Sequence, residues 1–151
     1  ISREHGSQGK GIGEIVASEL NIPFYSKELL SLAAEKSGLT EKFLSNTSSP
    51  KQGVPYNLYL SKSVESQSIE AQKEVLLSIA EKGSCVIVGR AADYVLRDNP
   101  NVVSIFIYAS EEIKIRNIME MYHDDYEEAK KRMKQSDKTR ARYYQSISSL
   151  K

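Results

Sequence analysis

A glycine-rich segment near the start of the chain has the residue types that bind phosphate. It spans residues 4–13 and reads EHGSQGKGIG, between a short strand-like stub and a helical pattern. Glycines let the backbone approach phosphate oxygens closely, and the N–H groups and dipole at a helix N-terminus favour negative charge. Lys10 could reach the β- and γ-phosphates of a nucleotide. The phosphate-loop motif G-x-x-x-x-G-K-[ST] is matched only in part. Glu4 stands at the position of its first glycine, and Gly11 stands at the position of its Ser/Thr. A structural turn is therefore the alternative.

A second candidate follows an apolar, β-branched run at 85–88, where Gly89 and Arg90 come directly after the expected strand. In open α/β sheets, ligands bind at the carboxyl ends of strands, and an arginine there can hold a phosphate with two bonds. Asp93 lies one helical turn further and could pair with Arg90 or face a ligand. The alternatives are a surface arginine that makes a cap or ion pair, and a solvated helix acid.

A third candidate is a basic run near the end of the chain. Between residues 130 and 142 there are seven Lys or Arg residues, with Asp137 as the only acid. Such a run is usually a solvated helix face. It could also be a lid whose arginines close over a transferring phosphate and stabilise its charge. Nucleic-acid binding has less support, because no aromatic residues are interleaved along the run.

These candidates need elements that position them. Apolar spacing predicts helices over 12–20, 26–36, 58–82, 91–97, 110–122 and 126–144, a short helix after Thr40, and a mobile loop at 45–53. Short apolar runs predict an extended piece at 23–25 and strands at 85–88 and 102–108. The alternation of strands and helices is typical of an α/β domain, in which we expect parallel strands buried on both faces.

The composition excludes several classes of protein. The chain has 151 residues, 40% hydrophobic and 27% charged, which suits one globular domain and excludes a disordered, collagen-like or disulfide-stapled chain. The formal net charge is +1, which excludes a global basic field for nucleic acid. Cys85 is the only cysteine, and no Cys/His cluster suits zinc. No run approaches the roughly 18 apolar residues of a membrane span, so we expect a cytoplasmic protein without a membrane partner.

Five segments, taken in order, resemble one known family. They read ISREHGSQGKGIG, IPFYSKELL, CVIVGRAADYVLRD, IFIYASEEIKIRNIMEMY and AKKRMKQSDKTRARYY, and they cover most of the chain. In this respect the chain is similar to the cytidylate kinase-like family, which is related to bacterial cytidylate kinase and to P-loop nucleoside monophosphate kinases. The resemblance implies a three-layer α/β/α P-loop NTPase fold with a mostly parallel sheet and a helical lid at about 124–145. It also implies transfer of the γ-phosphoryl of ATP to CMP or dCMP, with Mg²⁺.

The resemblance also implies roles for individual residues. The catalytic residues it implies are Lys10, Arg132 and Arg140. Those that bind the ATP phosphates are Gly6, Ser7, Gln8, Gly9, Lys10, Gly11 and Ile12. Those that bind the acceptor nucleotide are Tyr25, Lys27, Arg90, Asp93, Asp137 and Arg142. No residue is assigned as a metal ligand.

The chain departs from the family pattern at several of these positions. Ile12 stands where true cytidylate kinases have a threonine whose hydroxyl would ligate Mg²⁺, so the metal would have to use water or another residue. Ser26 replaces an expected aspartate, and Ala91 follows the Gly-Arg pair. The alternative is therefore a nucleotide-binding domain of the same fold without kinase turnover, and a nucleic-acid-binding module is a third hypothesis. The family continues past Tyr144, so we expect one domain that is incomplete at both ends. The sequence does not determine the oligomeric state.

Overall fold

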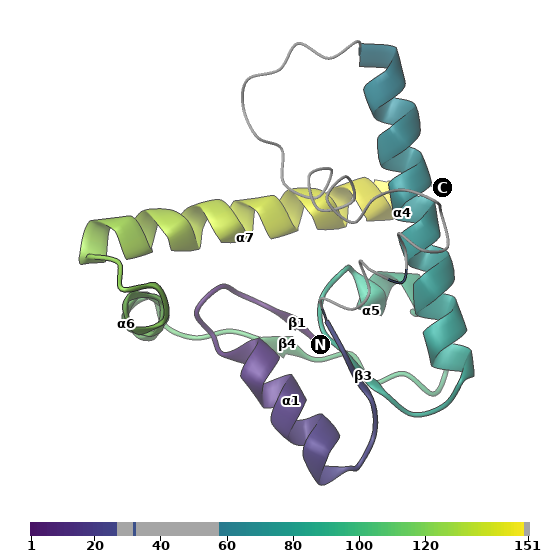
Figure 1. Cartoon of the computed structure of the whole chain (residues 1–151), viewed down its shortest axis with the longest axis horizontal. Helices are drawn as coiled ribbons and strands as arrows, with labels where there is room; N and C mark the ends of the chain where they lie inside the picture. Colours follow the sequence, from purple (N-terminus) through teal and green to yellow (C-terminus); the bar gives the residue numbers. More distant parts are fainter. Residues whose placement is uncertain (27–31, 33–57, 150–151) are drawn as a thin grey trace.

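The computed structural model describes residues 1–26, 32 and 58–149, and the side chains of 69–149 in the latter range. Within these residues the chain is an α/β protein with short parallel strands and helices (Figure 1). The strands are β1 (Ser2–Arg3), β2 (Phe24–Tyr25), β3 (Val86–Ile87) and β4 (Phe106–Ile107). The helices are α1 (Gly9–Glu19), α4 (Leu58–Glu81), α5 (Ala92–Val95), α6 (Glu111–Tyr122) and α7 (Tyr126–Ser149).

The strands form two parallel pairs that meet at Ile1. β1 pairs with β4, and β2 pairs with β3. The Ile1 nitrogen donates to the Ile87 carbonyl at 2.7 Å, and the Ile1 carbonyl accepts from the Gly89 N–H at 3.0 Å. These two bonds follow the parallel pattern, so the spatial order is β2–β3–β1–β4. The carboxyl ends of β1 and β3 consequently lie side by side.

Helices bury their apolar faces against this strand arrangement. Ala17 of α1 packs against Val86 and Val88, which brings the helix that follows β1 back over β3. On the α4 side, Leu76 and its neighbours pack against Ile87 and against α5. Burial of such side chains supplies about 25 cal/mol per Å² of apolar area, so α1 and α4 hold the strand ends in place.

The last two helices form a packed pair. Ser110 is the N-cap of α6, where its side chain accepts from the Ile113 N–H, and this confirms the predicted start of the helix. Ile118 of α6 is fully buried against Ala129 of α7. The last turns of α7 pack elsewhere, because Ile147 is buried with Ile69 and Ala91. α7 is therefore fixed at both ends, and Figure 1 shows it crossing the molecule from α6 to α4.

The structure corrects several sequence predictions. The strands predicted at 85–88 and 102–108 are shorter, and β4 is not buried on both faces: Phe106 is 60% exposed. The helix predicted at 91–97 is the short α5, and α7 continues past residue 144 to Ser149. The predicted helix at 26–36, the short helix after Thr40 and the loop at 45–53 lie outside the described residues, apart from residue 32.

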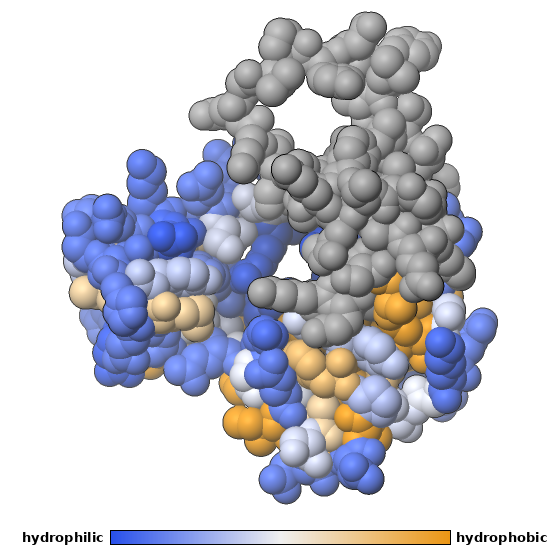
Figure 2. All heavy atoms as spheres, in the orientation of Figure 1, coloured by the Kyte–Doolittle hydropathy of each residue, from blue (hydrophilic) through white to orange (hydrophobic). Residues whose placement is uncertain are grey.

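Hydrophilic and apolar residues gather over different elements of the described part of the molecule (Figure 2). Figure 2 shows hydrophilic residues over α6 and α7, and apolar residues gathered over α1 and near the lower end of α4. None of the helices in the described ranges combines the length and apolar character needed to cross a membrane.

Candidate functional site

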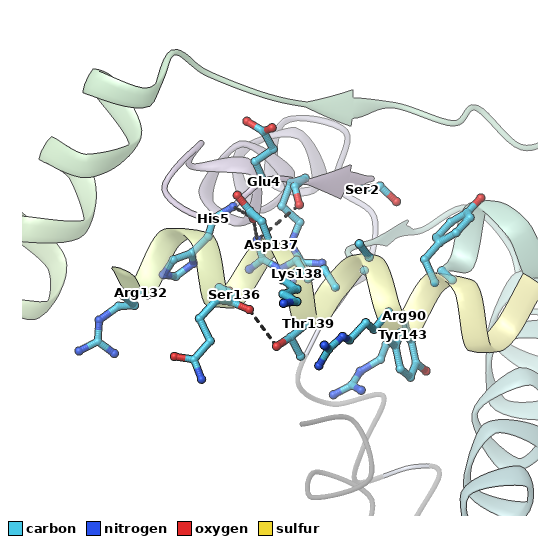
Figure 3. Close-up of a pocket in the computed structure, with 18 of the residues that line it drawn as sticks. Ser2, Glu4, His5, Arg90, Arg132, Ser136, Asp137, Lys138, Thr139 and Tyr143 are labelled. Atoms are coloured by element: carbon cyan, nitrogen blue, oxygen red, sulfur yellow. Dashed lines mark hydrogen bonds and ion pairs between the residues drawn. The ribbon is translucent and has the colours of Figure 1, made fainter. Parts of the chain in front are cut away.

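A cleft of about 1680 Å³ opens at the carboxyl ends of β1 and β3 and runs along α7 (Figure 3). Its walls come from the end of β1, the turn after β3, and one face of α7. The charged residues lining it are Arg3, Glu4, Arg90, Asp124, Glu128, Lys131, Arg132, Asp137, Lys138, Arg140 and Arg142. Cations outnumber carboxylates in this set, so the cleft suits an anionic ligand.

Three arginines from three separate elements lie close together at one end of the cleft: Arg3 in β1, Arg90 after β3, and Arg140 in α7. Arg140 Nη1 donates to the Arg3 carbonyl at 3.4 Å. Burial, together with the smaller effect of the neighbouring Arg140 and Arg90 charges, lowers the pKa of Arg3 to about 10. Burial also lowers the pKa of Arg140. These shifts are typical of cations that are held together and partly removed from water.

The turn that carries Arg90 has an unusual backbone. Gly89, Arg90 and Ala91 all have positive φ, at 88°, 58° and 50°. A non-glycine residue in this region costs energy and persists only where the surroundings hold it. Here the Arg90 guanidinium lies 5.4 Å from the centre of the Tyr143 ring, whose hydroxyl donates to Gln72 Oε1 at 2.8 Å. Figure 3 shows Arg90 beside Tyr143 along the cleft wall.

Asp137 connects α7 to the segment after β1. One carboxylate oxygen accepts the His5 backbone N–H at 2.7 Å and an Arg140 N–H at 3.4 Å, and the other lies 3.7 Å from Lys114 Nζ. Lys114 also donates to Glu4 Oε2 at 2.8 Å. Figure 3 shows Asp137 directed toward His5. The result is a charge network that holds β1, α6 and α7 in one arrangement.

Sequence reasoning did not single out Arg3, Glu4 or Lys114. The helix that contains Lys114 is predicted from its apolar stripe, which begins at Ile115. The Lys114 side chain is nevertheless only 10% exposed. A buried lysine in that position requires a partner. That requirement is the signal that could have indicated the network, although the partner Glu4 lies 110 residues away in the sequence.

The glycine-rich loop forms a tight connection between β1 and α1. Gln8 is the N-cap in the left-handed region, so Lys10 and Gly11 lie in the first turn of the helix. The buried Ser7 hydroxyl donates to the Glu4 carbonyl at 2.9 Å. Lys10 is half exposed and pairs with Glu14 at 3.2 Å. Among the described residues, Glu4 and His5 line the cleft, whereas residues 6–12 do not.

The other predicted site residues are divided between the cleft and its supports. Arg132 pairs with Asp124 through bonds of 2.5 and 3.0 Å, and its guanidinium lies 4.4 Å from the Tyr122 ring centre. The bond to Arg132 lowers the pKa of Asp124. Asp93 accepts from Ser2 and from the Tyr144 hydroxyl, both at 2.9 Å, and so joins α5 to β1 and α7.

The structure thus brings together five of the predicted residues in the cleft. They are Arg90, Arg132, Asp137, Arg140 and Arg142. Asp93 and Tyr25 are placed next to that end of the sheet without lining the cleft, and Lys27 lies outside the described residues. Across the described ranges, no group of three or more His, Cys, Asp or Glu side chains could hold a metal ion.

Comparisons with known proteins agree with the sequence resemblance. A family model described as the cytidylate kinase-like family matches residues 1–151. A solved structure, an uncharacterized protein from Eubacterium ventriosum ATCC 27560, is similar with a TM-score of 0.72 and 31% identity. That alignment covers 96% of this chain and 73% of the other chain. No curated protein matches the chain.

Proposed function

Because the chain belongs to the cytidylate kinase-like family, we propose that it transfers the γ-phosphoryl group of ATP to a nucleoside monophosphate, with CMP or dCMP as the acceptor. The observation that carries this proposal is the arginine-lined cleft at the carboxyl ends of β1 and β3. Phosphoryl transfer needs positioning and charge neutralisation more than covalent chemistry by the protein. Arginines fixed on separate elements meet both needs.

The strand order supports the finer fold that we propose, a three-layer α/β/α P-loop arrangement with a mostly parallel sheet. In the described residues the order is β2–β3–β1–β4, and a glycine-rich loop joins β1 to α1. In this order β2 and β3 lie on one side of β1, and β4 lies on the other. Open α/β sheets bind ligands at the point where the strand order changes direction in this way. The cleft lies at this point.

We assign the acceptor nucleotide to the part of the cleft near Arg90. Its strained turn and its contact with Tyr143 hold the guanidinium toward the cleft, where it can bind the acceptor phosphate. Arg140, which pairs with Asp137, lines the same cleft from α7 and can contact the same group. Arg142, Tyr25 and Lys27 are further proposed contacts to the acceptor, and Asp93 supports this wall through Ser2 and Tyr144.

We assign the donor nucleotide to the glycine-rich loop, residues 6–12. The N-terminus of α1 supplies free N–H groups and a positive dipole end. Lys10 would exchange Glu14 for a phosphate oxygen, and an exposed pair of this kind contributes only about 0.3–0.5 kcal/mol. Arg132 and Arg140, on the proposed lid at about 124–145, would neutralise the charge on the transferring phosphoryl group.

Mg²⁺, when bound, would neutralise charge on the phosphates of ATP. The described residues do not supply a protein cage for it, because no cluster of metal-ligating side chains exists there and Ile12 has no hydroxyl. Mg²⁺ commonly keeps several waters and binds through substrate phosphates. We therefore expect the ion to arrive with the nucleotide, and we assign no step to a protein-bound metal.

The test is coupled ADP release with a panel of nucleoside monophosphates. We expect turnover with CMP or dCMP above the rate with ATP alone. Arg90→Met should lower kcat/KM for the acceptor by about 10- to 150-fold, since a charge-assisted bond contributes about 1.5–3 kcal/mol. Arg116→Met is the matched control, because Arg116 is exposed on α6 and does not line the cleft. No turnover with any monophosphate, under conditions where ATP binds, would overturn the proposal.

A second candidate function is nucleotide binding without turnover. Ile12 at the expected hydroxyl position and the Lys10–Glu14 pair favour it. In that case ATP or ADP binds with measurable affinity, and no monophosphate stimulates ADP release. The same panel, read together with ATP titration, separates the two functions.

A further inference from the structure

We infer that Arg3 is a ligand-binding residue, which holds a phosphate group in the cleft together with Arg90 and Arg140. The inference deepens the proposed function and rests on it for the identity of the nucleotide that carries the phosphate. Arg3 is the last residue of β1 and precedes the glycine-rich loop.

Two glycines make room for the Arg3 side chain. A Cβ atom at Gly9 would lie 2.6 Å from Arg3 Cβ and 3.0 Å from Arg3 Cγ, so any larger residue there would displace the stem. A Cβ atom at Gly89, where φ is +88°, would overlap Arg3 Nη1. The stem therefore passes α1, and the guanidinium reaches the turn that carries Arg90. This path fixes the charge at the end of the cleft.

The charge of Arg3 lacks a counter-ion among the described residues. Its guanidinium takes part in no ion pair and no hydrogen bond within them. The nearby carboxylates are engaged by other cations: Glu4 pairs with Lys114, and Asp137 pairs with Lys114 and Arg140. Removing a cation from water without a partner is unfavourable, and adding it to two other guanidinium groups is more so. The arrangement costs stability in the free protein.

A bound phosphate would offset this cost. A phosphate monoester or a terminal phosphate of ATP carries close to two negative charges and several acceptor oxygens, which suits donors that converge from β1, the turn after β3, and α7. Guanidinium groups match such oxygens in pairs of parallel bonds. Even with its pKa lowered to about 10, Arg3 is a cation at neutral pH. A neutral or apolar ligand would leave the Arg3 charge without a counter-ion among the described residues.

The experiment is isothermal titration calorimetry, which measures the affinity of the wild-type chain and three variants for inorganic pyrophosphate, CMP, cytidine and ATP. Arg3→Met keeps most of the stem and removes the charge, Arg3→Lys keeps the charge without the planar fork, and Arg116→Met changes an exposed arginine outside the cleft. We expect pyrophosphate affinity to fall 10- to 100-fold in Arg3→Met and to a smaller extent in Arg3→Lys, with no change in Arg116→Met. A parallel loss for CMP assigns the phosphate to the acceptor, and a parallel loss for ATP assigns it to the donor.

A second measurement separates binding from a structural role. Thermal unfolding without ligand should occur at the same or a higher temperature in Arg3→Met, because a half-buried charge without a counter-ion among the described residues has been removed. A structural arginine would instead give a lower unfolding temperature with unchanged pyrophosphate affinity. That result would overturn the inference, as would unchanged affinity for every phosphate compound in both Arg3 variants.

The outcomes also distinguish the inference from the proposed function. Normal turnover with Arg3-independent affinities overturns the inference alone. Pyrophosphate affinity that depends on Arg3, in a chain without turnover on any monophosphate, overturns the kinase function and supports the phosphate site. A wild-type chain that binds none of the phosphate compounds overturns both.

Discussion

Replacing Asp137 with asparagine should loosen the connection between α7 and the segment after β1. The asparagine oxygen can still accept the His5 N–H, so the change removes mainly charge. Two ion pairs are affected, Asp137 with Lys114 at 3.7 Å and Asp137 with Arg140 at 3.4 Å. Lys114 keeps Glu4 at 2.8 Å, which prevents an orphaned buried cation. The loss is therefore smaller than for a fully broken buried pair.

The magnitude follows from exposure. The Asp137 and Arg140 side chains are 29% and 33% exposed, so solvent screens their pair and its loss costs about 0.2–1 kcal/mol. The Lys114 contact is more buried, and weakening it adds about 1 kcal/mol. We expect Asp137→Asn to lower the free energy of unfolding by about 1–2 kcal/mol.

Urea denaturation at neutral pH measures this change. Asp98→Asn is the matched control. The Asp98 side chain is 87% exposed, and its ion pair with Arg97 is long, at 3.7 Å. The control should change the free energy of unfolding by less than about 0.5 kcal/mol. A change in Asp137→Asn as small as in the control, with an unaltered denaturant slope, would refute the view that this carboxylate anchors α7.

Three further perturbations test other parts of the account. Gly89→Ala should lower the free energy of unfolding by about 1–3 kcal/mol in urea denaturation, because φ is +88° and the new Cβ meets Arg3. Gly11→Ala, whose Cβ meets nothing within 4 Å, should be neutral or stabilising in the same assay; equal losses would contradict this. Lys10→Ala should weaken ATP binding about 5- to 150-fold in a titration, and unchanged affinity would argue against the loop as the donor site. Burial lowers the pKa of His5, so the folded state disfavours its protonation. Stability should therefore fall as the pH drops below about 6.5, less steeply in His5→Gln; identical slopes in urea denaturation would contradict that.

The elements that local sequence determines were predictable. The apolar spacing from Ile12, the Ser110 cap and the β-branched run at 85–88 each depend on residues within a few positions of one another, and α1, α6 and β3 confirm them. The same reasoning placed Arg90 at a strand end. It failed for β4, because burial depends on what covers the strand, which local pattern does not record.

The contacts that build the site could not be predicted in this way. Glu4 meets Lys114 and His5 meets Asp137 across separations of 110 and 132 residues. No periodicity or motif links such positions. The position of Arg3 could not be predicted for the same reason, since the path of its side chain depends on the space left by Gly9 and Gly89. The chemistry of the cleft is a property of the folded chain, and single residue types indicated only part of it.

The most direct test of the central claim is ³¹P NMR of a mixture of ATP, Mg²⁺ and CMP with the wild-type chain. The claim is that the arginine-lined cleft binds the acceptor while phosphate is transferred to it. It predicts that CDP and ADP signals grow together in equal amounts, and that Arg90→Met slows both while Arg116→Met slows neither. Absence of CDP, or CDP formation that Arg90→Met leaves unchanged, would contradict it.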